Sequence, residues 1–271
     1  MGRGIAQVAA EAGFCTLLYD ADDAARERGF TAVHDAWRRL VERGKRDETQ
    51  VAAFAERLRV AENIAAAASA DLAIEAIFEN PVAKIALFRE LDAICPSETL
   101  LASNTSSISI TRLAGATSRP DRFVGMHFFN PAPVMPLVEV VRGLRTSDRT
   151  AERAAAVARA FGKTPVVVQD APGFVVNRVL LPMINEAVFA LSEGVAGKEA
   201  IDEAMKLGAA HPMGPLALAD LIGLDVCLDI LQTLHRDLGE DKYRPAPLLE
   251  RMVDAGLLGR KSGEGFYCYE S

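Results

Sequence analysis

The sequence predicts an α/β protein: a doubly wound sheet of mostly parallel strands, followed by an all-helical C-terminal domain. Two observations predict this fold. Short apolar segments alternate with helix-like segments over the first 170 residues, as in strands joined by helical crossovers. From Phe174 to about Ala255, nearly every segment instead has helical periodicity. We therefore expect two domains, residues 1–171 and 172–271, with the boundary near Pro172.

Composition excludes several classes of function. The chain has 271 residues, enough for two cores, and a net charge of -7, which disfavours nucleic-acid binding. The four cysteines form no Cys-x-x-Cys pair and are typical of free thiols in a reducing compartment. No apolar run approaches the roughly 20 residues of a membrane span, and the N-terminus has no apolar signal core. We expect a cytoplasmic protein that binds neither nucleic acid nor membrane.

The first elements can be predicted one by one. Residues 4–12 suit a helix, and Gly13 is placed to end it. Residues 14–19 form a short apolar run that closes on Asp20, which indicates a buried strand. Asp22 can cap a long amphipathic helix that runs to about Arg43.

The rest of the chain continues the two patterns. Further strands are expected at residues 72–77, 99–102, 123–129, 137–141 and 165–168. Helices are expected at residues 81–94 and 149–161 in the first domain, and at 175–191, 198–207 and 216–234 in the second.

The start of the chain resembles part of a dinucleotide site. Gly2 and Gly4 precede a helix, and a strand then ends in Asp20, 18 positions after Gly2. In dinucleotide folds a Gly-rich turn leads into the helix whose N-terminus binds the pyrophosphate, and an acidic residue about 20 positions on binds the ribose. Only the last part of that motif is present, because no strand precedes it. Asp20 could equally be a strand-end residue or a helix cap.

Three further places contain polar residues in apolar surroundings. Ser106 belongs to a polar run, residues 103–107, at the carboxyl end of a strand, where parallel sheets bind ligands; the alternative is a polar turn capping the next helix. His127 and Glu139 lie in two apolar strands, and a carboxylate there needs a partner. An imidazole oriented by a carboxylate is a good general base, although the two could form a structural pair. Asn177 follows the domain junction and points toward a cleft or packs against the linker.

Seven segments spread over essentially the whole chain form one pattern: residues 74–80, 103–107, 125–131, 137–141, 172–178, 211–215 and 261–267. In sequence and order they resemble the 3-hydroxyacyl-CoA dehydrogenase family, and most closely its short bacterial members that act on 3-hydroxybutyryl-CoA. The resemblance implies a Rossmann-type first domain, a helical domain that closes the cleft and forms a homodimer, and NAD as cofactor.

The resemblance also implies roles for individual residues. His127 is the base that takes the proton of the 3-hydroxyl, and Glu139 is its partner. Ser106 and Asn177 hold the substrate oxygen or the thioester near the nicotinamide. The residues implied to lie along the cofactor are Gly2, Asp20, Glu79, Lys84, Ser106, Asn130 and Lys261. Arg43 and Lys45 are the nearest matches for binding the CoA phosphates, although both could be solvated charges.

Two alternatives to this function remain, and part of the family's glycine motif is missing. A dehydrogenase of the same fold could oxidise a free hydroxy acid or sugar acid instead, or the chain could be an inactive truncated relative. Met1-Gly2 aligns with the end of the family's Gly-x-Gly-x-Met-Gly fingerprint, so the first strand and the first two glycines are missing. We expect the natural product to begin roughly a dozen residues upstream, because that strand lies in the middle of a doubly wound sheet.

Overall fold

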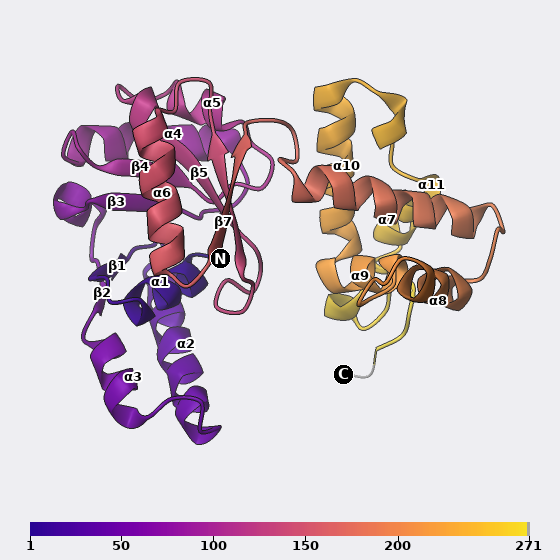
Figure 1. Ribbon diagram of the computed structural model, residues 1–271, viewed down its shortest axis with the longest axis horizontal. Coiled ribbons are helices and arrows are strands. Elements are labelled where there is room, and N and C mark those ends of the chain that lie inside the picture. Colours follow the sequence, from indigo (N-terminus) through magenta and orange to yellow (C-terminus); the bar gives the residue numbers. More distant parts are fainter. Residues whose placement is uncertain (270–271) are drawn as a thin grey trace. The chain divides into compact units, whose positions relative to one another are not determined.

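The computed structural model describes residues 1–269. The chain separates into two compact units, unit 1 with residues 1–170 and unit 2 with residues 171–271 (Figure 1). Unit 1 contains all seven strands of the described residues, and unit 2 is built from helices. The expected succession of an α/β domain and a helical domain is therefore present.

Unit 1 alternates helices and strands as the sequence predicted. Its elements are α1 (Gly2–Glu11), β1 (Thr16–Leu18), α2 (Asp23–Glu42), α3 (Glu48–Ala55), β2 (Leu58–Val60), η1 (Ile64–Ser69), β3 (Leu72–Glu75), α4 (Pro81–Ile94), β4 (Leu100–Ser103), α5 (Ile110–Ala114), η2 (Pro120–Arg122), β5 (Phe123–Phe128), β6 (Leu137–Arg142), α6 (Asp148–Ala160) and β7 (Thr164–Gln169).

The strands form two sheets rather than one. Five strands pair in the order β3-β4-β5-β6-β7, while β1 pairs with β2 alone. All neighbours are parallel except β5 and β6, which run antiparallel. The connection between β5 and β6 is only residues 129–136, which is too short for a parallel crossover of a dozen or more residues. The sheet is therefore mostly parallel, as expected, with one antiparallel pair between β5 and β6.

Helices cover both faces of the five-stranded sheet, as a doubly wound fold requires. In Figure 1, α6 crosses the front of the sheet, and its alanines share a core with α1 and with Met126 and Val140 of the strands. On the opposite face, Phe88 of α4 meets Phe123 with ring centroids 4.5 Å apart. Successive residues of a strand point to opposite faces, so His127 and Glu139 share the face of Phe123.

One position on that face has to be glycine. A Cβ built on Gly125 would lie 2.7 Å from Val141 Cβ and 2.9 Å from Ile110 Cδ1. Such contacts are far closer than van der Waals distance, so Gly125 allows α5 to pack directly on β5 and β6. The helix that follows the Ser106 segment is thereby fixed against the sheet.

The long helix α2 was predicted correctly, but its surroundings were not. Asp22 caps it by accepting from the amides of Ala24 and Ala25, and Arg43 is its C-cap. The strand expected to be buried before it, β1, is short and largely exposed, with Leu17 46% accessible. The reason is that β1 pairs along one edge only among the described residues. Helix α3 and strand β2 were missed, although Asp47 and Gln50 form a capping box that marks the start of α3.

Unit 2 has its own apolar core. Its elements are α7 (Val176–Ser192), α8 (Lys198–Gly208), α9 (Pro215–Ile222), α10 (Leu224–Leu238), η3 (Asp241–Tyr243), α11 (Pro247–Asp254) and η4 (Arg260–Ser262). The core includes Ile184, Leu216 and Leu231, all fully buried. A single helix over residues 216–234 was wrong: Gly223 has φ +105°, outside helical backbone space, and separates α9 from α10.

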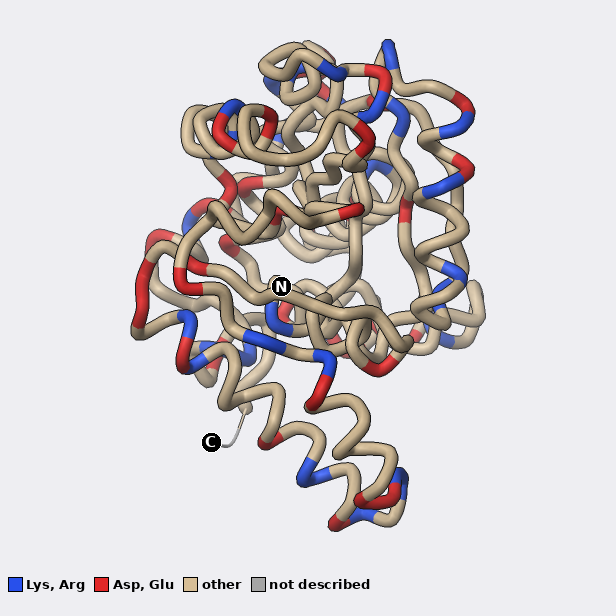
Figure 2. Tube along the Cα trace, turned by 90° about the vertical axis from the view of Figure 1, so that its left-hand side faces the viewer, with Lys and Arg blue, Asp and Glu red and all other residues tan. Residues whose placement is uncertain are grey.

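Charged residues of both signs are distributed along the whole chain. Figure 2 shows basic and acidic residues interleaved along the chain, including the projecting hairpin of α2 and α3. Among residues 1–269, no helix is both long and apolar enough to span a bilayer. The four cysteines are all unpaired, with Cys95 and Cys227 buried.

Candidate active site and cofactor edge

A buried histidine and glutamate face each other across β5 and β6. His127 lies directly opposite Glu139 in the antiparallel ladder, an arrangement that brings Cβ atoms to about 5 Å. The imidazole Nδ1 is 2.7 Å from Glu139 Oε2. Both residues are buried, with His127 6% and Glu139 1% accessible. The structure thus brings together the two residues that the sequence singled out most strongly.

This geometry defines what the imidazole can do. With Nδ1–H donated to the carboxylate, Nε2 has the lone pair that can accept a proton. Glu139 then stabilises the imidazolium that results, because a buried carboxylate next to a cation is favoured over either charge alone. The ring of Phe129 lies 4.5 Å from the imidazole, centroid to centroid, and limits its orientation. An imidazole oriented in this way is suited to proton exchange through Nε2.

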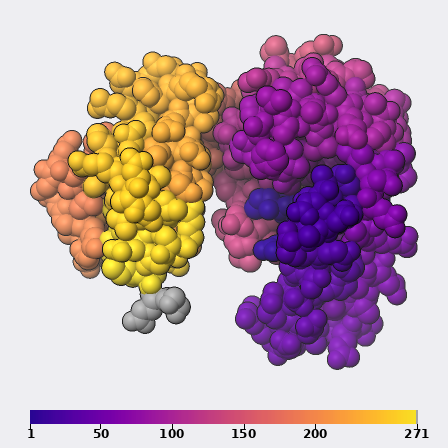
Figure 3. All heavy atoms as spheres, turned by 180° about the vertical axis from the view of Figure 1, so that it is seen from behind, coloured from indigo at the N-terminus to yellow at the C-terminus, as the bar shows by residue number. Residues whose placement is uncertain are grey.

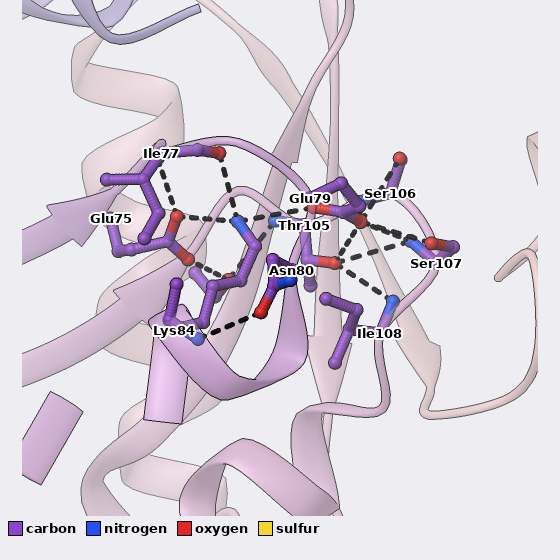
Figure 4. Close-up of polar contacts among 11 residues, drawn as sticks. Glu75, Ile77, Glu79, Asn80, Lys84, Thr105, Ser106, Ser107 and Ile108 are labelled. Atoms are coloured by element: carbon purple, nitrogen blue, oxygen red, sulfur yellow. Dashed lines mark hydrogen bonds and ion pairs between the residues drawn. The ribbon is translucent and has the colours of Figure 1, made fainter. Parts of the chain in front are cut away.

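The second cluster joins the carboxyl ends of β3 and β4. Glu79 Oε1 accepts hydrogen bonds from Thr105 Oγ1 at 2.5 Å and from the amides of Ser106 and Ser107 at 3.0 and 3.1 Å. Figure 4 shows its carboxylate between Lys84 and the Thr105–Ser107 segment. We call residues 104–108 the Ser106 loop. Glu79 therefore fixes the loop that the sequence predicted as a ligand-binding turn.

Burial would by itself raise the pKa of Glu79, but other interactions prevail. The Thr105 hydroxyl, the Lys84 ammonium and the Ser106 amide together lower the pKa of Glu79 below its ordinary value. All three favour the carboxylate over the neutral acid. Glu79 is accordingly negative throughout the neutral pH range.

Lys84 lies beneath this loop rather than on the surface. Its ammonium contacts Glu75 Oε1 at 2.6 Å, Glu79 Oε2 at 3.2 Å and the Ile77 carbonyl at 3.2 Å. Only 1% of its side chain is accessible. Sequence reasoning gave Glu75 no role, although an acidic residue ending an apolar strand is the kind of signal that reveals a buried partner. Glu75 also accepts from Ser103 Oγ at 2.6 Å.

The first turn of α1 lies at the same edge of the sheet. A Cβ on Gly2 would be 3.7 Å from Ala76, which follows β3, and a Cβ on Gly4 would be 3.3 Å from Ala132, which follows β5. The start of the chain, indigo in Figure 3, is visible on the surface. The small residues leave the helix N-terminus accessible at the carboxyl ends of the strands, the position in which such sheets bind anionic groups.

The remaining candidate site residues of unit 1 are exposed, and two of them lie far from Asp20. Asp20 is exposed just after β1, and its Oδ1 accepts from the Asp22 amide at 3.0 Å. Asn130 is exposed shortly after β5. Arg43 and Lys45 are exposed at the far end of α2, about 30 Å along the helix from its start near Asp20. The structure does not bring these two basic residues close to Asp20.

Two candidates belong to unit 2. Asn177 lies in the first turn of α7 and is 9% accessible. Lys261, in η4, forms a close ion pair with Asp225 in the first turn of α10. Lys261 lowers the pKa of Asp225, against the opposing effect of burial. Residues 1–269 contain no group of three His, Cys, Asp or Glu side chains arranged to bind a metal.

Two models of known protein families match the two units of the chain. The family model described as "3-hydroxyacyl-CoA dehydrogenase, NAD binding domain" matches residues 1–171, and "3-hydroxyacyl-CoA dehydrogenase, C-terminal domain" matches residues 173–269. A Bacillus subtilis protein named probable 3-hydroxybutyryl-CoA dehydrogenase is 57% identical over 270 residues, which is 100% of this chain and 94% of the relative. The human mitochondrial hydroxyacyl-coenzyme A dehydrogenase is 42% identical over 100% of this chain and 88% of its own.

A solved structure gives the same result. The crystal structure of (S)-3-hydroxybutyryl-CoA dehydrogenase from Ralstonia eutropha is similar with a TM-score of 0.97 and 48% identity, over 100% of this chain and 96% of that one. Matches of this identity and coverage establish common ancestry and fold. The chain belongs to the 3-hydroxyacyl-CoA dehydrogenase family and has the NAD-binding domain of these oxidoreductases.

Proposed function

We propose that this protein oxidises the 3-hydroxyl of (S)-3-hydroxyacyl-CoA to a ketone with NAD, and that 3-hydroxybutyryl-CoA is its substrate. The observation that supports this most directly is the buried His127–Glu139 pair at the carboxyl end of β5. Relatives at 50% to 57% identity are named for the same substrate. C3 can give up a hydride only if the proton of its hydroxyl has an acceptor, and His127 supplies one.

The oxidation removes a hydride from C3 and a proton from its hydroxyl, and each needs an acceptor. NAD, when bound, supplies the nicotinamide that accepts a hydride from C3. His127 Nε2 accepts the proton of the 3-hydroxyl, so the C3–O bond becomes a carbonyl and the imidazole becomes a cation. Glu139 stabilises that cation across 2.7 Å, and the proton passes from His127 to water after the products leave.

The other candidate residues bind and orient. Ser106 and Asn177 hold the substrate oxygen or the thioester, and Asp20 accepts hydrogen bonds from the adenosine ribose. The cofactor site also includes Gly2, Glu79, Lys84, Ser106, Asn130 and Lys261. The exposed first turn of α1, at the ends of β3 and β5, fits a pyrophosphate, and exposed Asp20 fits a ribose. Lys84 is buried, and it contributes through Glu79 and Glu75. Arg43 and Lys45 could contact only an extended ligand such as CoA.

Substrate class is tested by comparing thioester and free acid. NADH formation is followed with (S)-3-hydroxybutyryl-CoA, free (S)-3-hydroxybutyrate and a sugar acid at equal concentrations. We expect turnover of the thioester and, at most, traces with the free acids. Preferential turnover of a free hydroxy acid or sugar acid would show the alternative substrate class, and no turnover of any of them would indicate an inactive relative.

We also propose that two copies of the chain associate through the helical unit, in the cytoplasm. Unit 2 exposes apolar side chains that a partner could cover, among them Val179 at 68%, Val195 at 72% and Leu207 at 79%. The free cysteines are consistent with a reducing compartment. Light scattering of the purified protein, which reports the mass of the particle in solution, tests this association.

A further inference from the structure

The hydroxyl of Thr105 connects the Ser106 loop to the charged cluster of Glu75, Glu79 and Lys84. Thr105 is 1% accessible, and its Oγ1 donates to Glu79 Oε1 at 2.5 Å. The same oxygen accepts from the amide of Ile108 at 2.9 Å and, more weakly, from that of Ser107 at 3.4 Å. Thr105 is thus bonded to the carboxylate on one side and to the rest of its own loop on the other.

The backbone of Thr105 is attached to the same charges by a second route. Its amide donates to Ser103 Oγ at 3.2 Å, and Ser103 donates to Glu75 Oε2 at 2.6 Å. Lys84 bridges Glu75 and Glu79 from below. Figure 4 shows these contacts converging beneath the loop. Every member is hydrogen-bonded, and Glu75, Lys84, Ser103 and Thr105 are buried, so the network is stiff. Thr105 joins it to the loop beside the amides of Ser106 and Ser107, which also donate to Glu79 Oε1.

Ser106 is the residue that follows. It is half-buried and lies between β4, which ends at Ser103, and α5, which begins at Ile110, so no strand or helix determines its position. The contacts of its neighbours therefore matter more than they would within a regular element. We propose that Thr105 is a positioning residue for the reaction, which places Ser106 through its hydroxyl. This inference rests on the proposed function, in which Ser106 binds the substrate.

Loss of the Thr105 hydroxyl removes hydrogen bonds but leaves the buried volume nearly unchanged. Valine has nearly the shape of threonine, so Thr105→Val keeps the buried volume filled. It removes the closest donor of Glu79 and leaves the Ile108 amide without its acceptor. Unsatisfied groups of this kind are costly, and the loop lowers that cost by moving toward water. Ser106 then samples positions away from the substrate oxygen.

Three variants test the role. Thr105→Val is expected to lower kcat/KM for 3-hydroxybutyryl-CoA by roughly 10- to 100-fold. Thr105→Ser restores the hydroxyl and is expected to remain within about threefold of the natural protein. Thr117→Val is the matched control, because the Thr117 hydroxyl donates only to the Ala114 carbonyl, at the end of α5. Its kcat/KM is expected to be unchanged.

A double-mutant cycle separates this inference from the proposed function. If Thr105 acts through Ser106, Thr105→Val adds little to the loss already caused by Ser106→Ala. Losses that multiply independently would overturn the role of Thr105 and leave the function intact, as would near-normal activity of Thr105→Val beside an impaired Ser106→Ala. Normal activity of Ser106→Ala would instead remove the proposed role of Ser106, and this inference with it.

A measurement without substrate completes the test. Hydrogen exchange at the amides of Ser106, Ser107 and Ile108 is expected to accelerate in Thr105→Val and to stay protected in Thr105→Ser and Thr117→Val. Glu79→Gln, which weakens the bond from the carboxylate side and keeps Thr105, is expected to lose protection at the same amides. Unchanged exchange in both Thr105→Val and Glu79→Gln would overturn the proposal whatever the activity.

Discussion

Asp20 is the residue that we expect to determine cofactor choice. It is exposed after β1, and its neighbour Ala21 offers no positive charge to balance a 2′-phosphate. Its carboxylate accepts hydrogen bonds from ribose hydroxyls and repels the extra phosphate of NADPH. We predict a clear preference for NADH in kcat/KM, which Asp20→Asn reduces. Asp23→Asn, which removes a nearby exposed carboxylate, serves as the control, and equal kcat/KM for NADH and NADPH in the natural protein would contradict this role.

Glu79 gives a prediction about pH. Its pKa in the folded protein is lowered below the ordinary value of 4.5, so its ionised form stabilises the fold at neutral pH. That contribution is present above the ordinary pKa and is lost as the pH falls through the lowered one. The unfolding temperature of Glu79→Gln should therefore lie below that of the natural protein at neutral pH, and the difference should shrink in acid. A difference that is constant with pH would contradict the assignment.

At the level of residues, the sequence revealed polar groups that stand alone in apolar strands. His127 and Glu139 could be paired because each lies in an apolar strand and alternation fixes the face of Glu139. Glu75, Ser103 and Thr105 were not recognised as a network, because their contact depends on the register of β3 against β4, which places Glu75 beside Ser103. Register between strands far apart in sequence is not visible in a single sequence.

At the level of elements, Gly223 allows the turn between α9 and α10. Its φ of +105° is costly for any other residue, and a Cβ there would lie 3.0 Å from Asp225 Oδ1. We predict that Gly223→Ala destabilises the protein by about 1–3 kcal/mol. Gly208→Ala, at the end of α8, is the matched control, since nothing lies within 4 Å of its Cβ position. Thermal unfolding of the two variants checks this, and equal stability would show that Gly223 is not required.

Helix starts are easier to predict from the sequence than helix breaks or the exposure of a strand. Helix α4 was predicted with its bounds, because Asn80 caps it and Pro81 begins it. The break at Gly223 was missed because apolar periodicity continues through it, and a positive φ leaves no trace in that pattern. The exposure of β1 was missed because an apolar run shows what a strand could bury, and the pairing of its edges decides what it does bury.

At the level of the whole molecule, association of two chains is a separate prediction. Unit 2 exposes the apolar side chains of Val179, Val195 and Leu207, which a second chain could cover. Light scattering coupled to size-exclusion chromatography should give twice the 29.1 kDa of one chain. Leu207→Glu introduces charge on this unit and should shift the population toward the single chain if Leu207 lies in the interface. A monomer at all concentrations in the natural protein would contradict the prediction.

We propose that His127, oriented by Glu139, is the base in the oxidation of the 3-hydroxyl of 3-hydroxyacyl-CoA. The most direct measurement is kcat for NADH formation from (S)-3-hydroxybutyryl-CoA by His127→Gln, together with its NADH affinity. We predict a fall in kcat of about 10²–10⁴-fold or more, since general-base catalysis and orientation are both lost, with NADH binding nearly unchanged. A His127→Gln protein that binds NADH and turns over the thioester at a near-normal kcat would contradict the account.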